Sequence, residues 1–384
     1  MTWTETCLMD EKIKFIAMVK SDLYSFTSTC RQFGISRKTG YALMARYEVE
    51  GERALTARSR APHSHPNALD EAMVRKLLRL KTTFVHFGPR KVRDFLVNEG
   101  HRGPLPAPST IGELYKRHGL VRSRGRRRAR STPSTEPLRH ATAPNIVWSA
   151  DFKGHFKMKN GRWCYPLTLS DNASRYLLVC QGLAHPTEIA VWPHFEQAFR
   201  RYGLPGALRT DNGSPFASTA LGGLTHLAVW LLKLGITLER IKPGRPDQNG
   251  RHERMHRTLK DHIGPAQRSL AAQQHALTGF RRHYNNERPH DSLAGVPPAR
   301  CYTPSTRAYP SRLKSPEYGP EIEVRRVRSN GQIKWHGRLM FVSEALIGEP
   351  IGLQPIDDAR WRVLFCNMPL GVINDRLPHI ERLG

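Results

Sequence analysis

The sequence predicts a multidomain protein with all-α modules at the N-terminus, an α/β domain in the centre and a small β-barrel at the C-terminus. Three observations support this order. Capping residues and helical spacing of apolar residues continue to about residue 121. Strand patterns that alternate with helices begin at Asn145, and short strands with Gly- and Asn-rich turns follow Arg307. A chain of 384 residues is long enough for two or three domains.

The composition is strongly basic. A net charge of +27 and a pI near 10.4 exceed what solubility requires and indicate a polyanionic partner, for which nucleic acid is the default. A ribosomal or merely adhesive basic protein is the alternative at this point. The six cysteines include no Cys-x-x-Cys pair, which indicates reduced thiols in a cytosol and argues against a zinc module. Without a long apolar run or a signal peptide, we expect a soluble intracellular protein and no membrane partner.

Residues 1–55 fit a helix-turn-helix domain. Ser25 is placed to cap one helix, Ser36 to cap the next over Arg37–Val49, and Gly34 lies in the turn between them. The last helix of such a motif enters the major groove of DNA. An ordinary three-helix bundle is the alternative. The candidate DNA contacts near the start of this helix are Arg37, Lys38 and Tyr41.

Residues 68–121 fit a second helix-turn-helix domain. Asp70 is placed to cap a helix over Glu71–Lys81, and another helix begins near Pro89. Thr110-Ile-Gly-Glu113 matches a capping box, and Gly119 is placed to end that third helix. Two such modules would read a longer DNA sequence than one.

Residues 122–144 predict a basic, flexible linker. Its first nine residues contain six arginines, and the rest is rich in Ser, Thr and Pro, so the segment cannot bury apolar area. Arginine blocks beside DNA-binding modules follow phosphates or a minor groove without reading sequence. A solvated linker without DNA contacts is the alternative. The candidate contacts are Arg126, Arg127 and Arg128.

Residues 145–303 predict an α/β domain in which three strands are followed by helix, strand, helix, strand and helix. This is the order of the RNase H-like fold. The predicted strands are Ile146–Ala150, Trp163–Leu169, Tyr176–Cys180, Ala207–Thr210 and Ile236–Ile241. The predicted helices are Thr187–Tyr202, Leu221–Leu234, one that begins near Gly250, and Ala271–Asn285.

Residues 315–384 alternate short strands with turns and predict a small β-barrel. Its role is open between DNA binding and a structural cap.

Three acidic residues are placed to form a metal site in the central domain. Asp211 follows a short strand and enters an Asn-Gly turn, Glu253 lies on the helix that begins near Gly250, and Asp151 ends an upstream strand. Carboxylates in these places suit a hard metal ion that supports phosphoryl transfer. Asp171 and Glu239, the other acids near strands, are interpreted as surface or turn residues.

The segments around these acids resemble a known family. Trp148–Gly154, Arg209–Gly213 and Gln248–Arg254 are similar, in this order, to the motifs of bacterial insertion-sequence transposases with a retroviral-integrase-type (DDE) core and N-terminal helix-turn-helix domains. The resemblance implies that Asp151, Asp211 and Glu253 hold two Mg²⁺ ions, with Mn²⁺ as an alternative. It also implies that water first cuts the element's strand, and that the freed 3′-OH then attacks target DNA.

The choice of the third acid depends on the motif rather than on spacing. Asp211 and Glu253 have 41 residues between them, whereas Asp211 and Asp247 have 35 between them, which is the spacing usual in the family. Glu253 is preferred because Asn-Gly-x-x-Glu, followed by Leu-Lys, matches the family motif residue by residue, while Asp247 lies in a Pro-flanked loop. The extra length then corresponds to an insertion near Phe216–Leu227.

The remaining expectations concern DNA and partners. Lys260 lies two turns beyond Glu253 and could contact a DNA phosphate, with a helix salt bridge as the alternative. The resemblance implies double-stranded DNA as partner, both element ends and target, and self-association as a dimer or higher in a nucleoid-associated bacterial enzyme. A catalytically silent DNA-binding regulator and a general RNase H-like nuclease are the alternatives.

Overall fold

The computed structural model describes residues 8–57, 68–121, 138–218, 220–241 and 246–382. The chain divides into two compact units, Met1–Asp70 and Glu71–Gly384. Within the described ranges, no helix combines the length and apolar character needed to cross a bilayer.

The first unit is a small helical domain made of α1 (Leu8–Lys20), α2 (Phe26–Gln32), α3 (Arg37–Glu50) and a short 3₁₀ helix, Gly51–Leu55. Both predicted caps are confirmed, because the Ser25 and Ser36 hydroxyls accept hydrogen bonds from the amides of Ser28 and Thr39. Gly34 adopts a φ of +64° in the turn between α2 and α3, a conformation that glycine adopts without strain. The predicted helix-turn-helix geometry is therefore present.

Close contact between α2 and α3 depends on a glycine. A Cβ added at Gly40 would lie 2.7 Å from the Cys30 sulfur, so a larger residue there would force the helices apart. The apolar centre between the helices includes Phe15, Ile16 and Leu55. Ile13, on the same helix as Phe15 and Ile16, is 46% exposed.

The second unit begins with a three-helix bundle of α4 (Glu71–Thr83), α5 (Pro89–Asn98) and α6 (Pro108–Arg117). Val92 and Leu96 are buried inside it. The predicted capping box at Thr110 is wrong, because α6 begins earlier, at Pro108, with Ala107 at the cap position and no side-chain cap. Residues 99–107 connect α5 to α6, which is longer than the three or four residues typical of a helix-turn-helix.

The bundle is packed against the end of α10 (Leu270–Asn286). The rings of Phe84 and Phe87 stack on the imidazole of His283, with centroids 5.3 and 5.7 Å away. The Asn98 side chain donates to the Gly295 carbonyl at 2.8 Å, and Arg300 donates to the Asn98 side-chain oxygen at 2.8 Å. We call this contact the bundle–core junction.

The bundle–core junction should weaken in acid. Burial lowers the pKa of His283, and it lowers the pKa of His290 to about 3. The unfolded chain therefore binds protons below about pH 6.5 that the folded chain does not bind, so this stability is complete above that pH and is lost as the pH falls. His290 should reduce the free energy of unfolding by about 1.4 kcal/mol per pH unit below pH 6.5, and His283 should act in the same direction.

Thermal unfolding at pH 7 and pH 5, in wild type and in His283→Phe, measures this effect. Phenylalanine keeps a stacking ring but does not titrate, so the variant should lose less stability than wild type between the two pH values. Equal losses in the two proteins would contradict the prediction.

The central sheet contains six strands in the order β2-β3-β1-β5-β6, with β4 also paired to β3. β1 and β5 are parallel, as are β5 and β6, whereas β3 is antiparallel to β1, β2 and β4. Along the chain, the strands and helices follow the predicted order with one added short strand, β2. The bounds are β1 (Val147–Phe152), β2 (Phe156–Lys157), β3 (Trp163–Asp171), β4 (Leu177–Leu183), β5 (Ala207–Thr210) and β6 (Thr237–Arg240).

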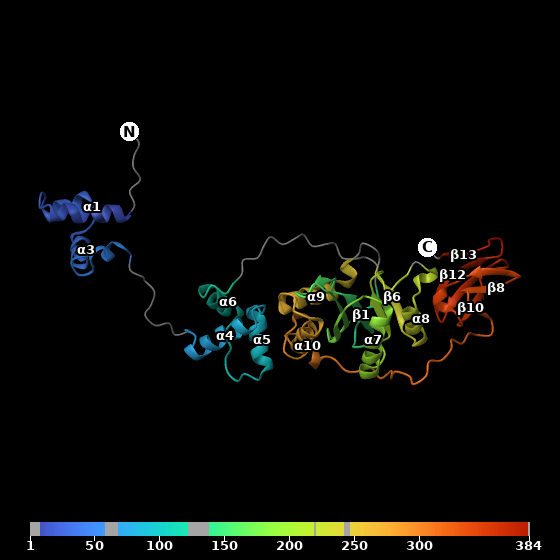
Figure 1. The fold of residues 1–384 in the computed structure, drawn as a ribbon. Coiled ribbons are helices and arrows are strands. Elements are labelled where there is room, and N and C mark those ends of the chain that lie inside the picture. Colours follow the sequence, from blue (N-terminus) through green and yellow to red (C-terminus); the bar gives the residue numbers. More distant parts are fainter. Residues whose placement is uncertain (1–7, 58–67, 122–137, 219, 242–245, 383–384) are drawn as a thin grey trace. The chain divides into compact units, whose positions relative to one another are not determined.

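Helices cover this sheet (Figure 1). α7 (Glu188–Tyr202) matches the predicted helix, begins after a Thr187 cap and continues through Pro193. α8 (His226–Lys233) begins at a Thr225 cap, five residues later than predicted, because residues 221–223 form a separate 3₁₀ turn. α9 (Gly250–Ile263) and α10 follow, and α10 packs on β4.

The C-terminal segment forms an open antiparallel sheet in the order β13-β12-β11-β10-β7, together with a β8–β9 hairpin. The predicted closed barrel is not confirmed, because within the described residues the two edge strands β7 and β13 are not paired with each other. The bounds are β7 (Glu323–Arg326), β8 (Gln332–Trp335), β9 (Arg338–Phe341), β10 (Pro350–Pro355), β11 (Arg360–Phe365), β12 (Met368–Asn374) and β13 (Ile380–Arg382).

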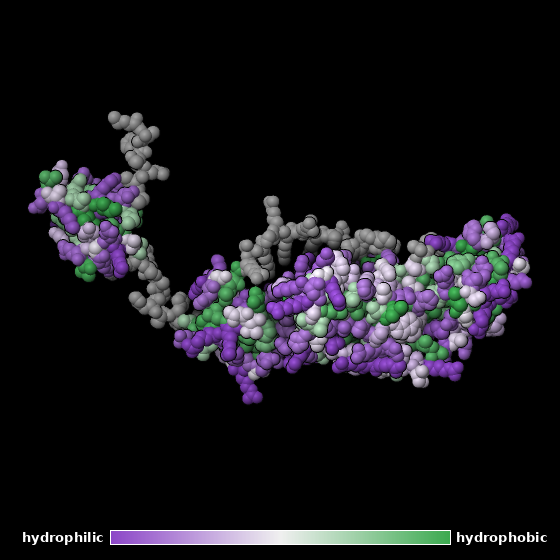
Figure 2. All heavy atoms as spheres, in the orientation of Figure 1, coloured by the Kyte–Doolittle hydropathy of each residue, from purple (hydrophilic) through white to green (hydrophobic). Residues whose placement is uncertain are grey.

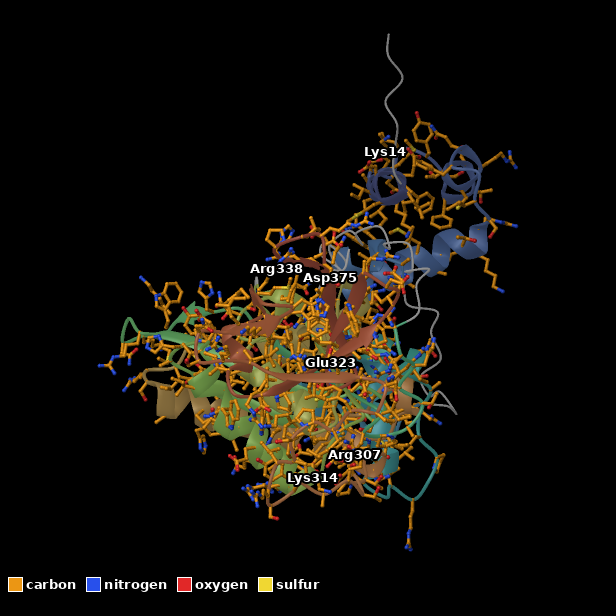
Figure 3. The ribbon with its side chains drawn as sticks, turned by 90° about the vertical axis from the view of Figure 1, so that its right-hand side faces the viewer. Lys14, Arg307, Lys314, Glu323, Arg338 and Asp375 are labelled. Atoms are coloured by element: carbon orange, nitrogen blue, oxygen red, sulfur yellow. The ribbon has the colours of Figure 1, made fainter. Side chains whose placement is uncertain are left out.

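Side-chain bonds fix the hairpin and the segment that precedes the C-terminal sheet. Arg338 in β9 donates to the Asp375 carbonyl at 2.8 Å (Figure 3). Arg307 donates to the carbonyls of Pro205 at 2.6 Å and Leu234 at 2.9 Å, so residues beyond α10 return to the central domain.

α8 belongs to two apolar cores. Leu227 and Leu231 pack in the cluster that α8 shares with the central sheet. Val229 and Leu232 pack with residues of the C-terminal sheet, such as Leu370. On the face seen in Figure 2, hydrophilic residues predominate and hydrophobic residues occur in small groups.

Candidate active site

Asp151 and Asp211 lie at one level on neighbouring strands. In the parallel pair β1–β5, Ser149 is opposite Arg209. Continuing this register by two residues places Asp151, in β1, opposite Asp211, the first residue after β5. Neighbouring strands are about 4.8 Å apart, and residues in register point to one face, so these two acids share one end of the sheet.

The turn after β5 holds the Asp211 carboxylate. The amide of Gly213 donates to Asp211 Oδ1 at 3.2 Å, and the Asn212 side chain donates to the Ile241 carbonyl at 2.6 Å. A Cβ at Gly213 would lie 3.1 Å from Asp211 Oδ2, so glycine leaves room for the carboxylate. The Asn-Gly pair therefore forms the turn that orients Asp211, as its sequence predicts.

Glu253 lies in the first turn of α9, and the helix contacts the sheet beside Asp151. His252 Nε2 lies 2.7 Å from the Thr168 hydroxyl of β3. Thr168 is opposite Asp151 in the β1–β3 register. Glu253 directly follows His252, and its charge acts on Asp151. The charges of Asp211 and Glu253 therefore both act on Asp151.

Two buried histidines on α9 were not identified as part of the site from sequence. His252 is 1% exposed and His256 is 7% exposed. Both Nε2 atoms lie 2.7 Å from the Thr168 hydroxyl, which also donates to the Asp151 carbonyl at 3.0 Å. His252 Nδ1 lies 2.9 Å from the Ser170 hydroxyl, and His256 Nδ1 lies 3.6 Å from Asp151 Oδ2. We call these five residues the α9–β3 polar network.

His256 is buried against the sheet, whereas Glu253 is exposed on another side of α9. His252 and His256 are four residues apart, and they lie on the same side of α9 as the buried Met255 and Leu259. That spacing is the signal that would have placed both imidazoles against the sheet.

The electrostatics of the cluster favour a bound cation. Burial and the negative charge of Asp211 raise the pKa of Asp151 to about 7, and Glu253 contributes in the same direction. Like charges crowded in a partly buried place are unfavourable unless they are protonated or share a cation. Three carboxylates supply the oxygen donors that Mg²⁺ prefers.

The histidines are poorly placed to act as metal ligands. Asp151, His252 and His256 bring potential ligand atoms within 4.8 Å of one another. However, both nitrogens of His252 and Nε2 of His256 already face hydroxyl groups. Only His256 Nδ1 and the Asp151 carboxylate remain, which is too few donors for a closed transition-metal site. The imidazoles instead hold α9 on the sheet.

The other acids have different surroundings. Asp247 lies in a 3₁₀ turn, Pro246–Asn249, just before α9. Asp171 was interpreted as a surface or turn residue, but it is 1% exposed and accepts hydrogen bonds from the amides of Asn145 and Ser174. Glu239 is paired with Arg209 at 3.0 Å. Asp171 and Glu239 therefore have structural partners.

Lys260 is exposed on α9 and lines a pocket of about 300 Å³ together with Lys153. Lys153 lies close enough to Asp151 to lower its pKa, which opposes the effect of burial. No ion pair of Lys260 occurs among the described residues, so the structure offers no support for the helix salt bridge weighed in the sequence analysis.

The predicted DNA contacts of the first unit are accessible. Arg37, Lys38 and Tyr41 lie in the first turns of α3 and are exposed. The Tyr41 ring stacks on Phe26 at 4.0 Å, so α2 fixes its position. Arg126, Arg127 and Arg128 lie outside the described residues.

Comparison with known families matches both parts of the chain. Residues 141–246 and 234–298 match two models that are each described as an integrase core domain. Residues 11–63 match a helix-turn-helix domain.

Relatives come from bacterial insertion elements. The chain is 30% identical over 240 residues to the insertion element IS476 uncharacterized 39.2 kDa protein of Xanthomonas euvesicatoria, covering 61% of this chain and 66% of that protein. It is 29% identical over 239 residues to the insertion element IS407 uncharacterized 31.7 kDa protein of Burkholderia multivorans, covering 61% of this chain and 82% of that protein. Among solved structures, the HTLV-2 integrase catalytic core domain in complex with magnesium covers 42% of this chain and 98% of its own at 18% identity, with a TM-score of 0.33.

The chain therefore belongs to the integrase core family and carries an N-terminal helix-turn-helix domain, and its relatives are proteins of bacterial insertion elements.

Proposed function

We propose that this protein is a DNA transposase that binds the ends of its insertion element, cuts DNA by metal-dependent phosphodiester hydrolysis and joins the freed 3′-OH to target DNA. The observation that carries the proposal is the convergence of Asp151, Asp211 and Glu253 at one end of the central sheet. The helix-turn-helix domain and the basic charge support DNA as substrate.

The chemistry follows from this cluster. Two Mg²⁺ ions would activate the attacking oxygen and stabilise the leaving oxygen. The chain's own groups set the geometry: Asp151 and Asp211 are held in register by β1 and β5, and the α9–β3 polar network fixes the helix that carries Glu253. Lys260 and Lys153 are placed to hold a phosphate beside the carboxylates.

A strand-transfer assay tests the proposal. The full-length chain is incubated with a duplex that carries the element's own end, with Mg²⁺, Mn²⁺ or EDTA. We expect end cleavage and joined products with either metal and neither with EDTA. End binding without any cleavage would indicate a silent regulator, and equal cleavage of unrelated DNA would indicate a general nuclease.

The arginine block should contribute affinity without specificity. Replacing Arg126, Arg127 and Arg128 with alanine should weaken binding to cognate and random DNA about equally, because phosphate contacts are insensitive to sequence. The slope of log affinity against log salt should become shallower by up to about 2.7. Fluorescence anisotropy on both DNAs measures this, and a loss confined to cognate DNA would mean that these arginines read bases or groove shape.

We further propose that the enzyme acts as a dimer or higher assembly in the bacterial nucleoid, because one carboxylate cluster processes one strand end and an element has two. Mixing an Asp211→Asn chain with a chain that carries alanine at Arg37, Lys38 and Tyr41 should restore strand transfer if one subunit holds an end that another cuts. Product yield measures the rescue. Absence of rescue, with mixed complexes shown to form, would mean that each subunit cuts the end it binds.

A further inference from the structure

A basic pocket lies beside α9, on a different face of the helix from the one that carries Glu253. A pocket of about 420 Å³ is formed by α5, the β3–β4 turn, α9 and the residues that follow α10. Its lining includes five cationic side chains and one carboxylate, Asp291. The five cations, which we call the basic pocket, are Lys91, Arg175, Arg251, Arg254 and Arg288.

Most of the hydrogen-bonding capacity of these cations is unused within the described chain. Lys91 donates to the Pro289 carbonyl at 2.7 Å and lies 3.4 Å from Asp291. Arg175 and Arg251 both donate to the Asn172 carbonyl. Each guanidinium carries five N–H donors, so the arginines can bind a further group that has several acceptor oxygens.

Burial makes the cluster unfavourable when it is empty. Desolvation lowers the pKa of Lys91, Arg175 and Arg288, and neighbouring arginines act in the same direction on Lys91 and Arg175. In addition, the buried Nε2 of His290 in the same lining has no hydrogen-bond partner within the described chain. An anion with several oxygens would relieve the charge repulsion and supply partners for these donors.

We propose that the basic pocket binds one backbone phosphate of the DNA substrate and thereby links the bundle–core junction to the active site. Lys91 comes from α5 of the helical bundle, and Arg251 and Arg254 flank Glu253 on α9. One phosphodiester in the pocket is therefore bound by the bundle and by the helix that supplies the third carboxylate. This inference rests on DNA being the substrate, as proposed above.

A chemical double-mutant cycle tests the site. Arg254 is exposed, and its side chain makes no hydrogen bond to the described chain, so Arg254→Ala removes a phosphate ligand without removing a structural hydrogen bond. Arg282→Ala, at an exposed arginine of α10 that does not line the pocket, changes the charge equally and serves as control. End binding by the full-length chain is measured in EDTA, with thermal unfolding as a check of folding.

We expect Arg254→Ala to weaken end binding about tenfold and to make the salt slope shallower by about 0.9, whereas Arg282→Ala should change little. In a set of duplexes, one phosphate at a time is replaced by a neutral methylphosphonate. At one position this replacement should weaken binding by wild type but leave binding by Arg254→Ala unchanged. A folded Arg254→Ala protein that matches Arg282→Ala on every duplex would overturn the proposal.

Two further results show whether the bound anion is free phosphate or a DNA phosphate, and whether a negative result concerns the basic pocket or the proposed enzyme activity. If inorganic phosphate raises the melting temperature of wild type but not of Arg254→Ala, and no methylphosphonate position is selective, the pocket binds free phosphate and the DNA assignment is wrong. If the wild-type protein shows no strand transfer, the proposed enzyme activity is rejected. The inference about the basic pocket is still decided by the methylphosphonate result, because DNA binding is measured without metal.

Discussion

Asp151→Asn, Asp211→Asn and Glu253→Gln should each abolish cleavage and strand transfer while leaving end binding intact. Each substitution keeps the size of the side chain and removes one of the negative charges that would hold the metal ions. Metal stabilisation of the transition state contributes several kcal/mol, so the rate should fall by about 10³-fold or more. Gel assays of end cleavage and joining, with anisotropy for binding, measure the two effects separately.

The matched control for this series is Asp247→Asn. Asp247 precedes α9 and stands at the alternative spacing from Asp211. Its substitution should leave strand transfer within a few-fold of wild type. An active Glu253→Gln protein together with an inactive Asp247→Asn protein would show that the third ligand is Asp247.

Thr168→Val should destabilise the second unit strongly and reduce activity. The Thr168 hydroxyl has one proton and two lone pairs, and it is placed to donate to the Asp151 carbonyl and to accept from His252 and His256. Valine has almost the same shape but leaves these buried groups without a partner. An unsatisfied buried group costs about 1–3 kcal/mol, so a total loss of about 3 kcal/mol or more is expected.

Denaturant unfolding of the full-length chain measures this loss, and Thr168→Ser provides the control. Serine keeps the hydroxyl and removes a methyl group, so its expected cost is about 1 kcal/mol. If valine and serine cost the same, packing rather than the hydroxyl would explain the role of Thr168. In the valine variant α9 is no longer held in place, so Mg²⁺-dependent strand transfer should fall more than end binding.

Local rules predicted much of the fold. The caps at Ser25 and Ser36 were identified because a hydroxyl before a helical pattern satisfies free backbone amides. The same rule was wrong at Thr110, because Pro108 could begin α6 earlier and proline is favoured in the first turn. Barrel closure was not predictable from alternation alone, since alternation does not specify which edge strands pair.

The candidate site was predicted unevenly for a related reason. Asp151 lies near the end of β1 and Asp211 directly follows β5, and the end of a strand is visible in the sequence. The roles of His252 and His256 depend on Thr168 and Ser170, which lie more than 80 residues away along the chain. The basic pocket likewise requires α5 to meet α9. Such long-range contacts arise from packing, and no local pattern encodes them.

The position of α8 between two apolar cores affects the distance between the C-terminal sheet and the candidate active site. Because the same helix packs on the central sheet through Leu227 and on the C-terminal sheet through Val229, the two sheets are joined by a solid layer rather than by a tether. Any partner that touches the C-terminal sheet is therefore kept at a constant offset from the Asp151 end of β1. α8 works as a spacer of fixed length, and altering that offset would require the helix itself to be rebuilt.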